Sequence, residues 1–342
     1  MSEPIELARE LGARLRSRPA PERRDCCCAP ATHELLSAGG FYTALVPERE
    51  GGLGLDLVEF IASVAELAHG CPESAWCAAA LAVGSARARA LFDADAGLRA
   101  ASSATGDASA RRSEGGWVLS GSFARVAGAR FATHFLGVAR AEGESGVLRF
   151  LAAREQFELR DEGPGAGACA GGVQFEQALI PATSASAAEA HLDSWSASVP
   201  AAALAAVFEG AAARAAEIHE QIVRAPPQAR PLDPDHQRWL GAAIARADAA
   251  RLLLREAAVA NAESVRLGSL ARQSMRYAWD AVQDALGVGG SPEREYREER
   301  ERIARFMLSG LSDPAAPPDE WIARQLARER LELALDAAPA VP

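Results

Sequence analysis

The stretch LLSAGGFYTALVPEREGGLGLDLVEFIASVAELAHGCPESAWCAAAL, residues 35–81, holds the clearest structural signals in the chain. Within this stretch, residues 46–56 contain a proline and three glycines and are typical of a loop. Residues 57–69 place apolar side chains at i, i+3 and i+4, the spacing of a buried helix. After a break at Gly70–Pro72, residues 73–92 are rich in alanine, the best helix former. The stretch therefore predicts a loop followed by two helices that pack together.

Helical patterns also flank this stretch on both sides. Residues 5–17 and 31–39 have the apolar spacing of short helices. The C-terminal part predicts helices near residues 199–223, 234–263, 265–286, 293–308 and 318–335. Proline-rich breaks separate several of them, and antiparallel helices of this length are typical of a bundle. The charged run at residues 293–302 predicts a solvated helix face with i,i+4 ion pairs.

The middle of the chain has a different pattern. Between residues 100 and 182, short runs of strand-forming residues alternate with turns rich in Gly, Asp and Ser. This pattern predicts an antiparallel β unit, a small barrel or sandwich. We therefore expect a mostly α fold with a central β domain: an N-terminal helical domain over 1–99, a β-barrel domain over 100–190 and a helical bundle over 191–342.

The composition excludes several classes of function. The chain has 342 residues and a net charge of −10, and no basic stripe stands free of acidic residues, so nucleic acid is not an expected partner. All 36 basic residues are arginine, which excludes a Schiff base on lysine, a pyridoxal-phosphate lysine and a P-loop lysine. No run of 18 apolar residues and no signal peptide are present, so we expect a cytoplasmic protein without a membrane partner.

The cysteines and histidines do not predict a metal site. Three of the six cysteines are consecutive, Cys26–Cys28, and no CxxC pair occurs. The six histidines are scattered, without an HxxxH or HExxH pattern. We expect reduced thiols and no metal.

Five motifs in this order resemble the acyl-CoA dehydrogenase superfamily. They lie in residues 35–81, 105–140, 172–182, 278–290 and 300–328. The first of them, with Ser74 and Trp76, is most similar to the flavin monooxygenase branch of that family. The resemblance implies a flavin, FAD or FMN, held between the β domain and the bundle. It also implies a homo-oligomer and, in the two-component enzymes, a partner reductase that delivers reduced flavin.

The resemblance also indicates the residues that would hold the flavin. In the β domain these are Ser102, Ser103, Ala127 and Gly128, with Ala127 at a position where the family usually has Ser or Thr near the flavin. At the end of a bundle helix they are Gln283, Gly287, Gly289 and Gly290, contributed by a neighbouring subunit. A helix C-cap and turn is the alternative interpretation of these glycines. The family's Arg-x-x-Phe-Gly motif is absent, so tight binding of flavin is in question.

Ser309 takes the position of the dehydrogenase glutamate, counted from Arg300-Glu301. A serine cannot remove a proton at neutral pH without an activating base. Glu209, the one acid in an apolar stretch of the helix at 199–223, is the alternative base, since burial would raise its pKa. The competing interpretation of Glu209 is a residue at the edge of the bundle.

Trp76, Phe306 and Leu308 are candidates for lining a substrate pocket, with core packing as the alternative. The leading hypothesis is a flavin-dependent oxidoreductase, a monooxygenase or an unusual oxidase that acts on a small or carrier-bound metabolite in secondary metabolism. One alternative is an acyl-CoA or acyl-carrier dehydrogenase or desaturase with Glu209 as base. The other is a flavin-free relative with non-redox catalysis or a scaffold role.

Overall fold

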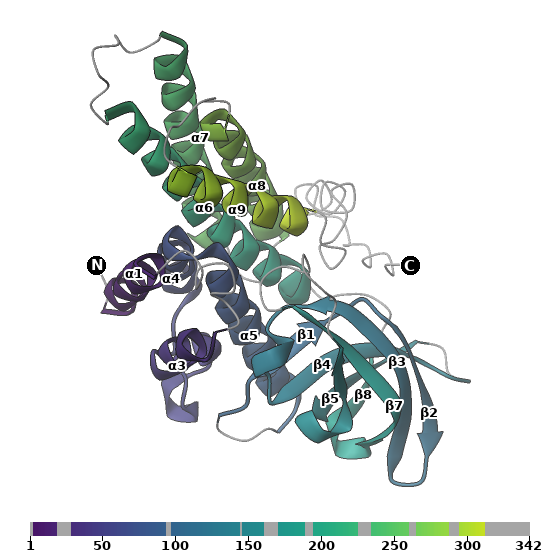
Figure 1. Ribbon diagram of the computed structural model, residues 1–342. Coiled ribbons are helices and arrows are strands. Elements are labelled where there is room, and N and C mark those ends of the chain that lie inside the picture. Colours follow the sequence, from purple (N-terminus) through teal and green to yellow (C-terminus); the bar gives the residue numbers. More distant parts are fainter. Residues whose placement is uncertain are drawn as a thin grey trace.

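The structure is a computed structural model, in which helices precede and follow the strands of one curved sheet along the chain (Figure 1). It describes residues 3–18, 29–93, 97–143, 146–160, 170–188, 194–224, 234–259, 265–286 and 294–311. In Figure 1 the N-terminal helices lie beside the long C-terminal helices, and the sheet lies below both.

The N-terminal part confirms the loop and helices predicted from residues 35–81. Its helices are α1 (Glu3–Arg16), α3 (Pro30–Ala38), α4 (Leu57–Gly70) and α5 (Pro72–Leu91). Asp56 caps α4, because its side chain accepts a hydrogen bond from the backbone N–H of Glu59 at 2.8 Å. In the preceding loop, a Cβ at Gly52 would lie 2.0 Å from the carbonyl oxygen of Val46, so only glycine fits there.

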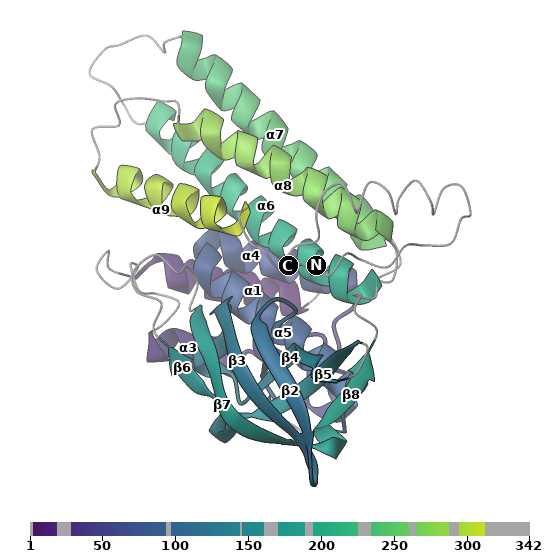
Figure 2. The same cartoon turned by 90° about the vertical axis from the view of Figure 1, so that its right-hand side faces the viewer.

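The middle of the chain forms an eight-stranded sheet in the order β6-β7-β3-β2-β4-β5-β8, with β1 paired in parallel with β4. The strands are β1 (Ala100–Ser103), β2 (Asp107–Ser113), β3 (Gly116–Val126), β4 (His134–Ala141), β5 (Val147–Ala153), β6 (Glu158–Arg160), β7 (Gly171–Pro181) and β8 (Ala185–Ala188). The sheet is curved (Figure 2). Its strands and the turn before β6 carry a cluster of buried phenylalanines, Phe123, Phe135, Phe150, Phe157 and Phe175. Contacting rings in this cluster have centroids 4.7–6.1 Å apart, and such aromatic packing supplies much of the core of this unit.

The C-terminal bundle is built around α6 (Ser194–Arg224). The other helices are α7 (Pro234–Val259), α8 (Val265–Leu286) and α9 (Arg294–Leu311), and α6 packs against all three as well as against α4 and α5. Close approach of α6 to α4 needs Gly210, since a Cβ there would lie 2.1 Å from the carbonyl oxygen of Ala65. The helix predicted over residues 318–335 lies outside the described residues, and the division into three domains stays a prediction.

Within the described part of the chain, one segment of α6 is long and apolar enough to cross a membrane. Ser198–Gln221 has a mean hydropathy of 1.3, and 89% of its most apolar window is buried inside the protein. Such a buried helix is what the centre of a bundle requires, so its composition is accounted for by packing.

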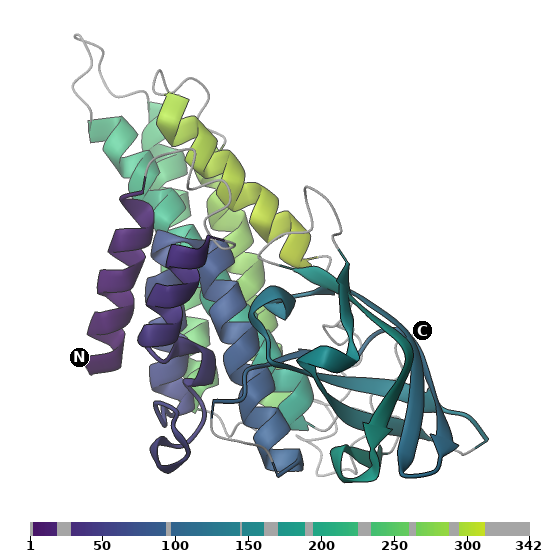
Figure 3. The same ribbon diagram turned by 60° about the horizontal axis from the view of Figure 1, so that its bottom comes forward.

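Helix α5 lies between the sheet and the bundle (Figure 3). It contacts β1 on one side, and α6 and α9 on another. The contact with β1 is a close one, because a Cβ at Gly84 would lie 2.1 Å from the carbonyl oxygen of Ala100. The hydroxyl of Ser85 accepts a hydrogen bond from the backbone N–H of Ala100 at 3.0 Å. Gly84 and Ser85 thus fix the sheet onto the helix.

Candidate functional site

The residues predicted to contact a flavin from the β domain meet where α5, β1 and residues 127–133 come together, and we call this place the junction. Gly128 has φ of +73°, a left-handed conformation that favours glycine, and a Cβ on it would lie 2.7 Å from Cγ of Leu81 in α5. Leu81 and Gly84 are three positions apart and share one face of α5. The loop at Gly128 and the strand at Ala100 therefore rest on the same face of one helix.

The two serines of β1 have different surroundings. The hydroxyl of Ser102 lies 3.3 Å from where a Cβ on Gly84 would be, so it stands over α5. Ser102 is exposed, and its hydroxyl has no hydrogen-bond partner in the described part of the chain. Ser103, by contrast, donates to the carbonyl oxygen of Thr105 at 2.8 Å and accepts from its N–H at 3.2 Å. Ser102 is thus available to a bound group, whereas Ser103 stabilises a turn.

Ala127 is half-buried and offers only a methyl group beside Gly128. A planar, largely apolar ring with polar edges would meet one free hydroxyl, from Ser102, and apolar surface from Ala127. The junction residues therefore fit a flavin in part, with fewer polar side-chain contacts than a Ser or Thr at 127 would give.

The predicted site residues of the bundle lie elsewhere in the chain. Gln283 is exposed on α8, whose main packing partners are α6, α7 and α9. Gly287, Gly289 and Gly290 lie outside the described residues. Within one chain, Gln283 is therefore not part of the junction.

Helix α9 carries the remaining predicted pocket residues except Trp76. The backbone of Leu308 and Ser309 belongs to α9, and their side chains are outside the described part. Phe306 is buried and packs edge-on against Phe208 of α6, with ring centroids 6.3 Å apart. Trp76 is half-buried on α5 at the edge of the core. These contacts agree with core packing, and the pocket roles of Trp76, Phe306 and Leu308 stay predictions.

Glu209 is buried in the bundle and forms an ion pair with an arginine. Its carboxylate accepts from Nε of Arg251 in α7 at 2.8 Å, and its side chain is 7% exposed. Burial raises the pKa of Glu209, and the hydrogen bond from Arg251 opposes that change. The carboxylate of Glu209 points towards α7 and is bound to Arg251. A catalytic role for Glu209 would therefore require this ion pair to open.

A buried polar cluster at the start of α5 was not found from the sequence. Glu73 accepts from Nη1 of Arg302 in α9 at 2.8 Å, and Sγ of Cys71 lies 3.5 Å from the Glu73 carboxylate and 3.6 Å from Nη1 of Arg302. The hydroxyl of Ser74 donates to Cys71 at 3.1 Å. Burial raises the pKa of Glu73 to about 8, although the charge of Arg302 acts in the opposite direction.

The prediction of a solvated helix face at 293–302 is wrong for two residues of its second half, whereas Glu301 is exposed as predicted. Glu299 and Arg300 are buried, at 7% and 5% exposure. Glu299 receives two hydrogen bonds from Arg214 of α6, at 2.9 and 3.2 Å. Arg300 donates to the carbonyl oxygen of Ala285 in α8 at 2.9 Å. These two buried groups therefore join α9 to α6 and to α8.

The same network extends from Arg214 to α4 and α1. Arg214 also donates to Glu217 at 2.9 Å, and Nε2 of His69 lies 3.0 Å from Glu217. Nδ1 of His69 lies 3.0 Å from Arg16, and since arginine only donates, Nδ1 must accept and Nε2 must carry the proton. Burial lowers the pKa of His69, which agrees with a neutral ring. His69 therefore connects helices.

Metal ligands do not gather in the described part of the chain, where no group of three His, Cys, Asp or Glu residues could hold an ion. The candidate site is therefore a junction whose named residues, Ser102, Ala127 and Gly128, carry no ionisable side chain. A reaction at the junction would therefore depend on a bound cofactor or other molecule that supplies the reactive group.

Comparisons with known proteins identify the fold. No family model matches the chain, and no curated protein matches it by sequence. Among solved structures, the 3-HSA hydroxylase from Rhodococcus sp. RHA1 is 17% identical, with 98% of each chain covered and a TM-score of 0.81. Dibenzothiophene monooxygenase (TdsC) from Paenibacillus sp. A11-2 is 15% identical, with 100% of each chain covered and a TM-score of 0.81. Butyryl-CoA dehydrogenase from Megasphaera elsdenii is 18% identical, with 97% of this chain and 99% of that chain covered and a TM-score of 0.81. The chain therefore has the acyl-CoA dehydrogenase fold, which confirms the predicted fold class.

Proposed function

We propose that the protein is a flavin-dependent oxidoreductase of the monooxygenase type. The observation that carries this proposal is the junction, where the exposed hydroxyl of Ser102, without a hydrogen-bond partner in the described part of the chain, and Gly128 lie against the same face of α5. The same fold is found in a hydroxylase and a monooxygenase. Position 309, where the dehydrogenase resemblance would require a carboxylate, is a serine.

In this proposal FAD or FMN is held at the junction. Solved relatives in fold include one in complex with FADH2 and one with FMN and indole. Ser102 would donate to or accept from a polar edge of the ring, and Ala127 would contact it without a hydrogen bond. When bound, reduced flavin would supply the electrons that activate oxygen. The residues of this chain would bind and orient the ring and exclude water.

The substrate would be a small or carrier-bound metabolite, in secondary metabolism, and the protein would work in the cytoplasm with a partner flavin reductase. Few polar side-chain contacts at the junction favour a flavin that is delivered and released. A homo-oligomer would bring Gln283 of a second copy to the adenine end of the cofactor, since Gln283 is exposed on its own chain.

Anaerobic titration with reduced FMN and reduced FAD tests this proposal, with the quenching of tryptophan fluorescence as the signal. We expect saturable binding, and we expect Ser102→Ala to weaken it about fivefold through the loss of one hydrogen bond, roughly 1 kcal/mol. Ser122→Ala is the matched control, because Ser122 is exposed on β3 and has no hydrogen bond in the described part. Absence of binding in both redox states would refute the proposal.

A second candidate is a dehydrogenase or desaturase with Glu209 as base. The buried position of Glu209 and its raised pKa favour it, and the ion pair with Arg251 opposes it. If Glu209 is the base, Glu209→Gln would abolish reduction of bound flavin by an acyl thioester. The flavin-free alternative, supported by Ala127, predicts no flavin binding at all.

A further inference from the structure

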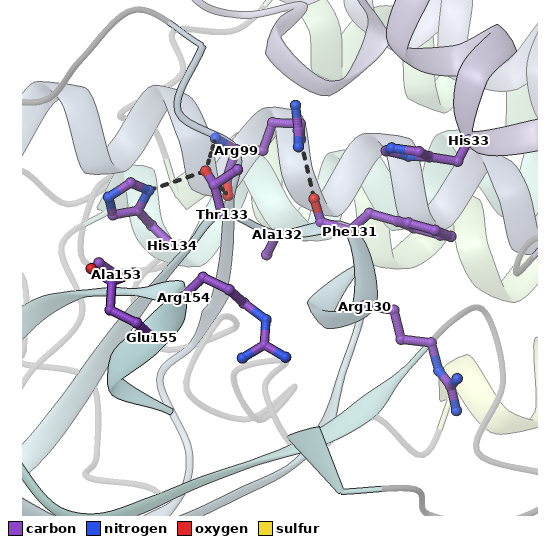
Figure 4. Close-up of a pocket in the computed structure, with 10 residues that line it drawn as sticks. All are labelled: His33, Arg99, Arg130, Phe131, Ala132, Thr133, His134, Ala153, Arg154 and Glu155. Atoms are coloured by element: carbon purple, nitrogen blue, oxygen red, sulfur yellow. Dashed lines mark hydrogen bonds between the residues drawn. The ribbon is translucent and has the colours of Figure 1, made fainter. Parts of the chain in front are cut away.

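A pocket of about 470 Å³ lies against residues 130–134, which overlap segment 127–133 of the junction (Figure 4). Its walls come from α3, from residue 99 just before β1, from residues 130–134 and from residues 153–155 at the end of β5. This volume is within the range of small-molecule sites, about 300–1,000 Å³. Three arginines and one acid, Glu155, line it.

Arg99 is held in a defined orientation in this pocket. Its Nε donates to the carbonyl oxygen of Phe131 at 3.1 Å, and its backbone N–H donates to the hydroxyl of Thr133 at 2.9 Å. The two terminal nitrogens of its guanidinium have no partner in the described part of the chain. Arg99 is half-buried, so bulk solvent screens the positive charge of its guanidinium only in part.

Arg154 is the second arginine fixed by a neutral partner. Its Nη1 donates to the carbonyl oxygen of Phe157 at 2.8 Å, and its guanidinium lies 5.0 Å from the centre of the Phe157 ring. In the described part of the chain, neither Arg99 nor Arg154 forms an ion pair. Arginines of the bundle such as Arg214 and Arg302 are paired with carboxylates. The positive charge of Arg99 and Arg154 is therefore not neutralised by a fixed carboxylate.

The other groups of the pocket leave a positive balance. Burial and the charge of Arg99 lower the pKa of His33, so its ring is neutral at pH 7. Its Nδ1 lies 3.1 Å from the hydroxyl of Tyr42, and its ring stacks on Phe131 with centroids 4.4 Å apart. The guanidinium groups of Arg99 and Arg154, which form no ion pair in the described part of the chain, outweigh the one carboxylate in the lining, that of Glu155, and make the site cationic. Planar guanidinium groups bind phosphate through paired hydrogen bonds better than other side chains do.

We propose that this pocket binds a phosphate monoester or inorganic phosphate, with the terminal nitrogens of Arg99 contacting the phosphate and Arg154 adding positive charge to the pocket wall (Figure 4). The hydroxyl of Thr133, which lies 3.1 Å from Nδ1 of His134, adds a neutral hydrogen-bonding group to the same wall. The inference does not depend on flavin, because none of the contacts that support it involves Ser102, Ala127 or Gly128.

Isothermal titration of the full chain with inorganic phosphate and with phenyl phosphate, at constant ionic strength and pH 7.5, tests the proposal. Binding of both ligands indicates a site for the phosphate group itself, and binding of phenyl phosphate alone indicates a site for an ester. Either result supports the proposal. No heat of binding for either ligand up to about 10 mM would overturn it.

Variants identify the residues responsible. We expect Arg99→Gln to weaken binding about tenfold and Arg154→Gln to weaken it about threefold through the loss of a nearby positive charge. Glu155→Gln should strengthen it about threefold, since a like charge is removed. Arg111→Gln is the control, because Arg111 is exposed on β2, away from the pocket lining, and it should leave affinity unchanged. Arg99→Gln could fail to fold, because Arg99 also donates to the carbonyl oxygen of Phe131. In that case Arg154→Gln and Glu155→Gln still test the assignment. Unchanged affinity in both of those would refute the assignment.

Discussion

The junction and the helix interface at α4, α6 and α9 use side chains in opposite ways. At the junction, Ser102, Ala127 and Gly128 are neutral, and one hydroxyl is left without a partner among the described residues. At the helix interface, Arg214 is bound to Glu217 and Glu299, and Glu217 also contacts His69. The acids and bases described there stabilise contacts between helices. A reaction at the junction would therefore need its reactive group from a bound molecule.

The largest expected effect comes from breaking the charged interface. Glu299→Ala removes the partner that gives Arg214 two hydrogen bonds, and both side chains are under 10% exposed. A buried charge left without this partner should lower the free energy of unfolding by about 3 kcal/mol, measured by urea denaturation. Glu256→Ala is the control, since the Arg266–Glu256 pair is exposed and should contribute less than about 1 kcal/mol. Equal losses in the two variants would show that the buried network adds no special stability.

A second variant tests the packing of the junction. Gly84→Ala places a Cβ 2.1 Å from the carbonyl oxygen of Ala100, so α5 and β1 must separate. We expect a loss of about 2 kcal/mol in stability. It should also weaken flavin binding, because Ser102 stands over Gly84.

Gly241→Ala in α7 provides the matched control for Gly84→Ala. No atom lies within 4 Å of a Cβ at Gly241, so alanine there should stabilise the protein by about 0.5–1 kcal/mol through its higher helix propensity. Opposite signs for the two variants are expected in thermal unfolding. Stabilisation by Gly84→Ala would contradict the close contact between α5 and β1.

The pH dependence of stability gives a smaller effect. The pKa of Glu73 is raised to about 8 from 4.5, so the native state binds its proton more tightly than the unfolded state does. The resulting stability is present at low pH and is lost as the pH rises toward about 8. Between about pH 6.5 and pH 8, the wild type should lose about 1–2 kcal/mol more than Glu73→Gln, as measured by urea denaturation at each pH. Glu48→Gln, at an exposed position, should keep the wild-type slope. A parallel slope in Glu73→Gln would show that Glu73 does not titrate in this range.

The same contrast explains what the sequence could predict. Periodicity and glycine-rich turns located the described helices and the strands of the sheet, because local patterns reflect which face is buried. The burial of Glu299 and Arg300 and the ion pair of Arg302 could not be predicted, since a charged helix has the same sequence whether its partners are water or Arg214 and Glu73. The role of Gly84 was missed for a similar reason: it depends on the approach of Ala100, which is distant in sequence.

The candidate site was located only in part. Ser102, Ala127 and Gly128 come from segments about 25 residues apart, and the resemblance to the family suggested them where residue types alone could not. The predicted role of Gln283 would require a second copy of the chain, and contacts between copies are not encoded in any local pattern.

The central claim is that the junction holds a flavin, and the most direct measurement is the affinity for reduced FMN and FAD without oxygen. The account predicts saturable binding with a Kd in the micromolar range, about −8 kcal/mol. Ser102→Ala and Gly84→Ala should weaken this binding, and Ser122→Ala should leave it unchanged. Failure of wild-type protein to bind either flavin, oxidised or reduced, or equal binding by all four proteins, would contradict the account.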